Sequence, residues 1–559
     1  MVWTGNSLFT SDWKGWVALQ PSCFTEATSG KLLRLKFRDL KQEAVATICK
    51  KDWTAMPGIS SPSVLSGNHV DFTITPTMLA LLQAEGCIVQ GSGFTLTSAE
   101  IISKDEVSKL RQTVPVDNDW LWTPPATPII KVIIDNPTAV ATTAHVELII
   151  RTAKLEPYTT LETSVNIGAG QQEVVPFQIT PQPGFYECTA LVNDELARTF
   201  TFGYAPEYTV SPPDMQSDFL SFWQKAKAEL AATPLDINMS MIPSKSTAKR
   251  HVFLVEVRSA SDQTGEVFMR AYYAEPTGSG TYPALIHFMG HDNGTQAPYC
   301  MNGDDMPLFA EMYVSIRGQF INNRPPYTNP YGSDYFSYGF GSKEDYYFRG
   351  AYLDALRAVD FLCTREKVQK QNIFAEGSSQ GGSLAIAAAA LSDGRVSAIA
   401  PSVFALSDFP DYFQLTPWPG TEAKEKKREL GMTDEEMYSM LSYFDAKNMA
   451  TMITCPVFMN YSLQDDMCPP SINWAFYNNV ITKDKKYLTN PTLGHQIAEN
   501  WWEEFLRFFG DHIKTEGIES TQSASEYDES FYTLDGRKLQ QIPTRPGIYV
   551  NKGKKVVIK

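Results

Sequence analysis

A single glycine-rich turn constrains the fold of this chain more than any other feature of its sequence. The residues Gly377-Ser378-Ser379-Gln380-Gly381-Gly382 follow a predicted strand and precede an alanine-rich helix over Ser383–Leu391. Glycine on both sides of Ser379 removes the side chains that would collide where strand and helix cross. The motif therefore predicts a strand–turn–helix unit that holds Ser379 at a helix N-terminus, clear of a sheet.

From about Pro206 onward, short apolar runs alternate with amphipathic helical patterns. This alternation is typical of an α/β domain with a doubly wound, mostly parallel sheet and helices on both faces. A first helix is expected within Asp214–Leu230, with Phe219, Phe222, Trp223, Ala226 and Leu230 on one face. Strands are expected over Ala284–Phe288, Met312–Ile316, Asn372–Ala375, Ala398–Val403, Val457–Tyr461 and Lys486–Asn490, and further helices over Tyr352–Cys363 and Trp501–Phe509.

Two all-β domains are expected before residue 206. Residues 1–113 carry strand patterns at Lys31–Leu40, Val70–Thr75 and Phe94–Ile102 and a helical run at Thr77–Ala84, which suits a sandwich or jelly roll. Residues 114–205 open with Pro115–Pro125, expected to be a linker. Turn signals at intervals of about 8–12 residues then predict an immunoglobulin-like sandwich. Its expected strands are Ile129–Ile134, Ala144–Ile150, Thr163–Ile167, Glu173–Ile179, Tyr186–Val192 and Thr199–Phe202.

The last 45 residues, 515–559, differ in composition from the rest of the chain. Thr515–Asp528 is polar and is expected to be a linker. Phe531–Lys538 and Gly547–Ile558 have the pattern of hairpins. Seven Lys or Arg and no acidic residue follow Asp535. The segment resembles the C-terminal sorting tails of secreted bacterial proteins; the alternative is a small β appendage of the enzyme.

Charge and composition narrow the classes of partner. The 559 residues include 48 Lys plus Arg and 63 Asp plus Glu, so the net charge is −15. This balance argues against a nucleic-acid groove or an anionic membrane surface and suits a neutral substrate such as a sugar polymer. No run approaches the ~18–20 apolar residues of a transmembrane helix. The eight Cys form no CxxC pair, and no metal or cofactor is expected.

A serine at neutral pH needs a base and an acid to act as a nucleophile. After a nucleophile in this kind of turn, the partners follow in the order acid, then histidine. Only His495 and His512 lie after Ser379, and His495 follows the last expected strand, where a loop could carry it over Ser379. Asp465 and Asp466 both follow the strand Val457–Tyr461, so chemistry alone leaves the acid open between them.

Backbone N–H groups are expected to stabilise a developing oxyanion, because fixed dipoles meet new charge without rearranging. One is the amide of Gln380, directly after the serine. The other is expected from the loop after Ala284–Phe288, with the amide of His291 as the candidate. The side chain of His291 is expected to be a solvent-exposed loop residue and not a catalytic one.

The stretch Pro206–Lys514 resembles the acetyl xylan esterase / cephalosporin-C deacetylase family (carbohydrate esterase family seven) of α/β-hydrolases. The resemblance implies an α/β-hydrolase fold and a Ser-His-Asp triad of Ser379, His495 and Asp465, because the first Asp of the family's Asp-x-x-Cys-Pro-Pro motif is the acid. Arg317, Gly318, Gln319, Gly377 and Gly381 fall in its structural and pocket motifs. The matching segments, in order, are Asp218–Trp223, Arg317–Gln319, Tyr346–Gly350, Asp354–Ala358, Gly377–Gly382, Asp465–Pro470 and Gly494-His495.

Several positions depart from the family pattern. Phe320 stands where the last Gly of Arg-Gly-Gln-Gly is expected, and Gln496 replaces an acid after the histidine. Met289 and His291 replace a His and a Tyr in the oxyanion loop. The segment Ile321–Gly341 also diverges, and its aromatic residues are expected either to form a rim for sugar stacking or to lie in an interface; they are Tyr327, Tyr331, Tyr335, Phe336, Tyr338 and Phe340.

These features together predict a secreted serine esterase that removes O-acetyl groups from xylan or xylo-oligosaccharides. A prolyl-oligopeptidase-like peptidase, another ester hydrolase and a glycan-binding surface protein with an inactive esterase fold are the alternatives. The N-terminus has neither a basic nor an apolar leader region, so a cytoplasmic protein, or removal of a signal peptide, is expected. The segment Glu85–Thr97 resembles the end of a carbohydrate-binding-type module, so residues 1–113 are expected either to bind glycan or to be structural. The family often assembles into homo-oligomers, which the added β domains could block.

Overall fold

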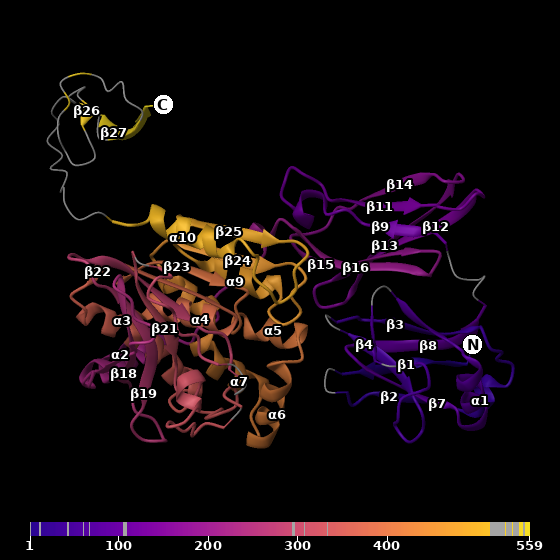
Figure 1. Ribbon diagram of the computed structural model, residues 1–559, viewed down its shortest axis with the longest axis horizontal. Helices are drawn as coiled ribbons and strands as arrows, with labels where there is room; N and C mark the ends of the chain where they lie inside the picture. Colours follow the sequence, from indigo (N-terminus) through magenta and orange to yellow (C-terminus); the bar gives the residue numbers. More distant parts are fainter. Residues whose placement is uncertain are drawn as a thin grey trace. The chain divides into compact units, whose positions relative to one another are not determined.

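The computed structural model (Figure 1) describes residues 2–514 except 11–12, 42–43, 60, 66–67, 104–108, 293–296, 307 and 333. In the tail it describes residues 531–532, 539, 541, 547–551 and 554–558. Two compact units divide the chain, Met1–Ile513 and Lys514–Lys559. Among the described residues, no helix has the length and apolar character needed to span a bilayer.

The first β domain is a sandwich of two four-stranded antiparallel sheets, β1-β8-β3-β6 and β2-β7-β4-β5. Alternating residues of each strand point inward and form one core, which includes Leu33, Leu35, Val89 and Leu96. The expected strands and helix are confirmed in place. The element bounds are β1 Trp3–Phe9, β2 Trp16–Leu19, β3 Leu32–Arg38, β4 Val45–Cys49, β5 Ser63–Val64, β6 His69–Thr73, α1 Pro76–Glu85, β7 Cys87–Ser92 and β8 Phe94–Ile102.

The second β domain is also a two-sheet sandwich, with strand orders β10-β16-β15-β12-β13 and β14-β11-β9. The expectation that Pro115–Pro125 is a linker was wrong. Trp120 and Trp122 are 1% and 5% exposed, and Trp120 stacks on Phe200 with ring centroids 4.3 Å apart. The strands are β9 Arg111–Thr113, β10 Leu121–Trp122, β11 Ile129–Asp135, β12 Thr142–Thr152, β13 Pro157–Ile167, β14 Gln172–Gln178, β15 Gly184–Val192 and β16 Leu196–Tyr204.

The third region contains a nine-stranded sheet in the order β17-β18-β19-β21-β20-β22-β23-β24-β25. In the part of the sheet ordered β21-β20-β22-β23-β24-β25, neighbouring strands pair in parallel, as expected. In the part ordered β17-β18-β19-β21, neighbouring strands pair antiparallel, which the sequence patterns did not predict. The strands are β17 Asn238–Met241, β18 Arg250–Arg258, β19 Phe268–Pro276, β20 Tyr282–Phe288, β21 Ala310–Ser315, β22 Val368–Ser378, β23 Val396–Ser402, β24 Val457–Ser462 and β25 Lys485–Asn490.

Helices cover both faces of this sheet, which confirms the doubly wound architecture (Figure 1). The helices α3 (Tyr347–Thr364) and α4 (Gln380–Leu391) bury one face. The helix α10 (Trp501–Asp511) buries the other through Phe505, Phe508 and Phe509, which pack on Phe374 of β22 and Phe458 of β24. The strand ends between these layers are therefore held rigidly, and the loops that follow them are the natural place for a site.

The predicted helix near residue 220 is confirmed as α2 (Phe219–Ala232), and its five expected face residues are the ones buried. Between β23 and β24 the chain forms a group of short helices that the sequence analysis did not predict. They are α5 Phe409–Leu415, α6 Gly420–Leu430, α7 Asp434–Leu441 and α8 Ala446–Met449, and α9 (Pro470–Asn479) follows β24.

The aromatic residues of Ile321–Gly341 are mainly core residues, so neither the sugar-stacking rim nor an interface is correct for most of them. Tyr331, Tyr335, Phe336 and Phe340 are between 1% and 7% exposed. The ring of Phe336 lies among the rings of Tyr346, Phe348, Phe409, Phe413 and Trp418. The closely spaced aromatics predict a rim or an interface, but Phe336 packs against Phe409 and Phe413 of the unpredicted helix α5.

In the second unit, β26 (Phe531–Tyr532), β27 (Gly547–Asn551) and β28 (Lys554–Ile558) form one antiparallel sheet in chain order. The pairing of β27 with β28 confirms the second predicted hairpin. The expected linker Thr515–Asp528 and most of the first predicted hairpin lie outside the described residues.

Candidate active site

Ser379 lies in a sharp turn between β22 and α4, as the glycine pattern predicts. Its backbone has φ of 55° and ψ of −127°, a region that residues with a side chain rarely adopt. The Ser379 N–H donates to the Ser402 carbonyl of the next strand at 3.0 Å, and its own carbonyl accepts from Gly382 at 3.0 Å. The turn is held from both sides, and an unfavourable backbone at a single serine is the signature of a functional constraint.

Glycine is required at the positions around this serine. A Cβ added to Gly381 would lie 2.0 Å from the Phe288 carbonyl oxygen, and one added to Gly377 would lie 2.5 Å from the Gly381 backbone. At Gly382 the added atom would lie 2.6 Å from the Phe404 Cβ. Strand β20, the turn and helix α4 approach each other too closely for any other residue.

The loops after β24 and β25 bring Asp465 and His495 together. The Nδ1 of His495 lies 2.9 Å from the Oδ2 of Asp465. The other carboxylate oxygen of Asp465 accepts from the backbone N–H groups of Met467 and Cys468 at 2.9 and 2.7 Å. Burial raises the pKa of Asp465, against the lowering effect of His495 and the backbone N–H groups. This is the geometry of an acid that orients an imidazole.

The other candidates from the sequence occupy different places. Asp466 is half-exposed and, like Asp465, lines the groove described below. His512 lies just past the end of α10, and its ring contacts the Phe508 carbonyl and Asp484 at 2.7 and 3.0 Å. Of these candidates, Asp465 is the one for which the structure gives a contact with His495.

Cys468 connects this pair to the serine, a role that no physical pattern in the sequence indicates. Its backbone N–H donates to Asp465, while its buried side chain contacts the Ser379 side chain and lies 3.7 Å from the Tyr412 hydroxyl. Burial raises the pKa of the Cys468 thiol well above its usual value, so the thiol is neutral. It acts as a neutral contact behind the serine.

The loop after β20 passes directly beside the serine. A Cβ built on Gly290 would lie 3.9 Å from the Ser379 Cβ. The expectation of a solvent-exposed His291 is not met. Its side chain is half-buried, with its ring 5.5 Å from Tyr335 and 6.0 Å from Trp418, and burial lowers its pKa. A neutral imidazole thus lines the space in front of the loop.

The side chains of Gln319 and Gln380 form a reciprocal amide pair. Gln319 donates to the Gln380 carbonyl oxygen at 3.2 Å and accepts from the Gln380 amide at 3.1 Å. Gln319 also accepts from the Asp292 N–H at 3.0 Å and donates to the Tyr347 hydroxyl at 2.9 Å. The amide of Gln319 therefore ties the loop after β20 to the residue that follows the serine.

Arg317 supports this region from behind and does not face it. Its guanidinium is 2% exposed and bonds Asp354 through Nε at 3.0 Å and Nη2 at 2.8 Å. A third contact, at 2.8 Å, goes to Asp262. A Cβ on Gly350 would lie 2.1 Å from Nη1 of this group, so the helix needs glycine there. At Gly318, with φ of 69°, the chain turns toward Gln319.

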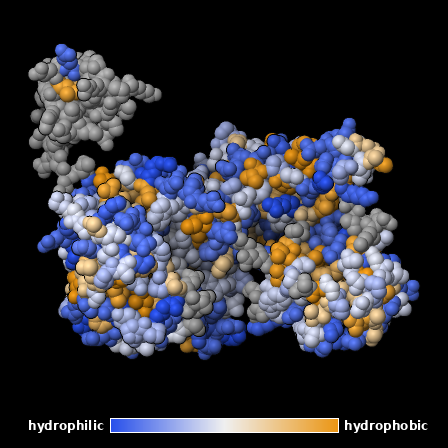
Figure 2. All heavy atoms as spheres, viewed as in Figure 1, coloured by the Kyte–Doolittle hydropathy of each residue, from blue (hydrophilic) through white to orange (hydrophobic). Residues whose placement is uncertain are grey.

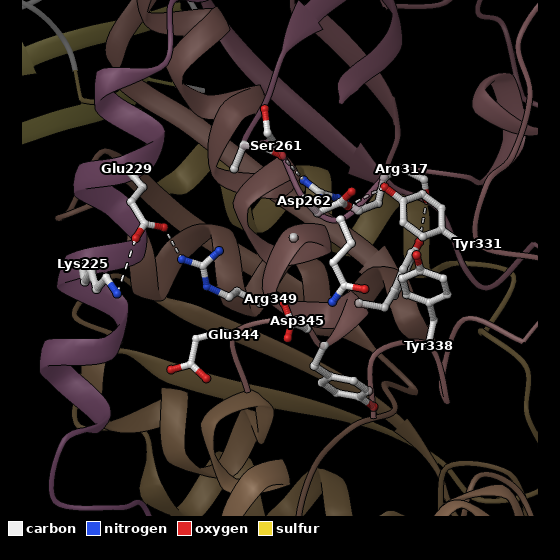
Figure 3. Close-up of a pocket in the computed structure, with 15 residues that line it drawn as sticks. Lys225, Glu229, Ser261, Asp262, Arg317, Tyr331, Tyr338, Glu344, Asp345 and Arg349 are labelled. Atoms are coloured by element: carbon white, nitrogen blue, oxygen red, sulfur yellow. Dashed lines mark hydrogen bonds and ion pairs between the residues drawn. The ribbon is translucent and has the colours of Figure 1, made fainter. Parts of the chain in front are cut away.

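A pocket of about 320 Å³ lies on the outer side of Arg317 (Figure 3). Tyr331 donates to Asp262 at 2.6 Å, and Arg349 pairs with Glu229 across the pocket. Asp262 joins Arg317 to Tyr331 at this pocket, so we assign the pocket a structural role in fixing Arg317.

The second β domain contacts the acid loop directly. The Gln464 side chain accepts from the Thr201 N–H at 2.7 Å and donates to the Thr201 carbonyl at 3.0 Å. A groove of about 810 Å³ runs beside this contact and is lined by both β domains and the loops that carry Asp465 and Gly494. Polar residues predominate along it, including Lys41, Asn68, His69, Glu195, Arg198 and Asp466.

Known proteins resemble the part of the chain that carries this site. A family model described as acetyl xylan esterase (AXE1) matches residues 206–512, which is more than half of the chain. The chain is 26% identical over 346 residues to the acetyl esterase Axe7A of Xylanibacter ruminicola, a match that covers 59% of this chain and 73% of that protein.

Solved structures of similar proteins each match about half of the chain. An acetyl xylan esterase from Paenibacillus sp. R4 is 27% identical, covers 55% of this chain and 98% of its own, and has a TM-score of 0.48. Acetyl xylan esterase 1 from Thermoanaerobacterium sp. JW/SL YS485 is 24% identical with the same coverage and TM-score.

Proposed function

The chain belongs to the acetyl xylan esterase family of carboxylic-ester hydrolases, and from this premise we propose that Ser379, His495 and Asp465 are its catalytic triad. The observation that carries the proposal is the 2.9 Å contact between His495 Nδ1 and Asp465, joined to Ser379 through Cys468. A carboxylate on Nδ1 leaves Nε2 of the ring free of a proton and able to accept one from serine.

In the proposed reaction, Ser379 Oγ attacks the acetyl carbonyl carbon while His495 takes the hydroxyl proton. The backbone N–H groups of Gln380 and His291 stabilise the oxyanion of the tetrahedral intermediate. When that intermediate collapses, His495 returns the proton to the departing sugar oxygen and an acetyl-enzyme forms on Ser379. Water, deprotonated by the same histidine, then releases acetate and regenerates the serine.

The substrate we propose is O-acetylated xylan or its oligosaccharides. The relative Axe7A is described as an acetyl esterase and the similar solved structures as acetyl xylan esterases. Polar and charged side chains line the groove of about 810 Å³ beside the acid loop, and its walls from both β domains give it the extent that a polymer needs. An insoluble or long polymer is met outside the cell, so we propose a secreted or surface location.

A serine-directed fluorophosphonate probe tests the nucleophile, because it labels only a serine activated by its neighbours. The wild-type chain is expected to be labelled in a 1:1 ratio and to hydrolyse a small aryl acetate. Ser379→Ala is expected to lose both, whereas Ser378→Ala, the adjacent serine at the end of β22, keeps both. Labelling that persists in Ser379→Ala would contradict the assignment.

A further inference from the structure

Two tryptophans on the first β domain are half exposed and touch each other. Trp16 is 53% exposed and Trp53 is 50% exposed, whereas tryptophan is highly buried on average. Their ring centroids lie 5.9 Å apart with an interplanar angle of 83°. Figure 2 shows hydrophobic and hydrophilic residues interspersed on the surface of this domain; on its hydropathy scale tryptophan is near neutral, so the pair is identified by its exposure. Exposed aromatic surface of this kind marks an interaction site.

The position of Trp16 is fixed by the sheet β2-β7-β4-β5. Its neighbour Val17 points into the core at 7% exposure, so Trp16 points to the outer face. In the strand register Trp16 lies opposite Gln90, and Gln90 lies opposite Thr47. One cross-strand row on the outer face therefore carries an indole, an amide and a hydroxyl.

Trp53 is brought over this row by the turn after β4. The turn is closed by the Trp53 N–H, which donates to the Lys50 carbonyl at 3.0 Å. Asp52 fixes it further by accepting from the Thr54 N–H at 3.0 Å. Trp53 has φ of 65°, which is unfavourable for a large side chain. The fold thus holds an exposed indole in a costly conformation next to a second one.

The two residues that continue the row from Trp16, Gln90 and Thr47, are polar and uncharged. Gln90 and Thr47 are half-buried, and within the part of the chain that the structure describes neither side chain makes a hydrogen bond. In the turn that carries Trp53, Lys50 and Asp52 lie 3.8 Å apart, so their charges offset each other. Charge complementarity therefore favours a neutral ligand with hydroxyl groups over an acidic or basic one.

We propose that the outer face formed by Trp16, Thr47, Trp53 and Gln90, here called the Trp16–Trp53 face, binds a neutral glycan chain. The two indole faces stack on pyranose rings through their C–H edges, and the Gln90 amide and Thr47 hydroxyl bond sugar hydroxyls. The choice of a xylan-type glycan rests on the proposed function of the esterase. The face would keep the enzyme on the polymer that it deacetylates.

Retention on insoluble, chemically deacetylated xylan tests the proposal with the full chain, because that probe has no ester to hydrolyse. Wild type is expected to be retained, and Trp16→Ala/Trp53→Ala to be retained at least about tenfold more weakly, which corresponds to about 1.4 kcal/mol. Trp16→Phe, which keeps a ring, is expected to retain most of the binding. Tyr208→Ala, which removes another aromatic that is 66% exposed, is the matched control and is expected to behave as wild type.

A second readout separates loss of the site from loss of folding. Soluble xylo-oligosaccharides are expected to shift the tryptophan fluorescence of wild type to the blue, and the double variant is expected to keep its melting temperature but show no shift. Equal retention of wild type and double variant, or no retention of wild type, would overturn the proposal. So would a change of oligomeric state in the variant, which would make this face a contact between two copies. Trp-dependent retention without acetate release from acetylated xylan would instead leave this face intact and refute the esterase substrate.

Discussion

The peptide backbone at Ser379 has a conformation that only its surroundings can sustain. A positive φ at a residue with a side chain costs of order 1–3 kcal/mol. Here the cost is offset by backbone hydrogen bonds to Ser402 and Gly382 and by the close packing that Gly377 and Gly381 allow. Under the proposed mechanism, this turn aims the hydroxyl at the substrate before any substrate binds.

Asp465 is expected to matter far more than its neighbour. Asp465→Asn keeps the shape but loses the carboxylate that selects the histidine tautomer, so kcat is expected to fall by about 10³–10⁴-fold with little change in KM. Asp466→Asn removes the same charge from the same loop without touching His495, and kcat is expected to stay within about threefold. Steady-state kinetics on a small aryl acetate distinguishes them. Equal losses in both variants would contradict the assignment of the acid.

At the scale of single residues, chemical reasoning from the sequence predicted part of the site, and the family resemblance was needed for the rest. The turn and the order of acid and histidine pointed to Ser379 and His495, but two adjacent aspartates satisfied the same rule. Only family resemblance selected Asp465, and the backbone N–H groups of Met467 and Cys468 explain that choice. The Gln319–Gln380 amide pair joins residues 61 positions apart, which no local pattern indicates.

Strand β20 is fastened to its neighbours by a buried ionic cluster. His287 contacts Glu376 of β22 at 2.5 Å and Glu311 of β21 at 3.1 Å, and Arg250 of β18 contacts Glu311 at 2.8 Å. The His287 ring is sandwiched by Tyr313 and by Trp502 of α10, at 4.1 and 5.4 Å. This cluster lies two residues before the loop that passes Ser379, so it fixes where the loop begins.

The His287 cluster gives a testable dependence of stability on pH. Burial disfavours the charged imidazole, but the two carboxylates outweigh it and raise the pKa of His287 to about 9. The protonated His287 therefore contributes to the free energy of unfolding. This contribution is fully present below the unfolded pKa of about 6.5 and is lost as the pH rises toward 9. The difference is on the order of 3 kcal/mol. Chemical denaturation at pH 6.5 and 9.5 is expected to show this loss in wild type.

His287→Gln provides the comparison. The variant is expected to be less stable at pH 6.5, because it lacks the charged imidazole. It is also expected to lose less stability on going to pH 9.5, because it has no His287 charge to lose. The cysteine and tyrosine groups that also titrate in this range are the same in both proteins. An identical pH dependence in wild type and variant would show that the charge on His287 does not contribute.

Elements with a regular period were predicted, and those defined by distant partners were not. The face of α2 and the hairpin β27–β28 follow from spacing and turn residues alone. The strands β17 to β19 and the helices α5 to α8 were missed because their patterns are short and their stability comes from tertiary packing. Tertiary packing also decides the structure of Pro115–Pro125. Its composition is typical of a linker, but Trp120 and Trp122 pack in a core.

The second β domain and the esterase domain are linked at the acid loop. Gln464, one residue before Asp465, bonds both the N–H and the carbonyl of Thr201 and also donates to the Pro491 carbonyl at 2.6 Å. The buried core continues from the sandwich into the esterase domain. Movement of the sandwich would therefore move the residue next to Asp465, the proposed triad acid.

Gln464→Glu tests this link, because it replaces an N–H donor by an oxygen that faces two carbonyls. Each unsatisfied group costs about 1–3 kcal/mol, so the melting temperature is expected to fall by several degrees. Asp466→Asn, in the same loop, is the matched control and is expected to melt as wild type. An unchanged melting temperature in Gln464→Glu would contradict a structural role for this contact.

Acetate release from acetylated xylan is the measurement that tests the central claim most directly. The full-length wild-type chain is expected to release acetate, and Ser379→Ala, with an unchanged melting temperature, is expected to release none above the uncatalysed rate. Retention of both proteins on the same xylan would show that binding is intact in the variant. Acetate release that persists in Ser379→Ala would contradict the proposed nucleophile. No acetate release by a wild type that still hydrolyses a small aryl acetate would contradict the proposed substrate.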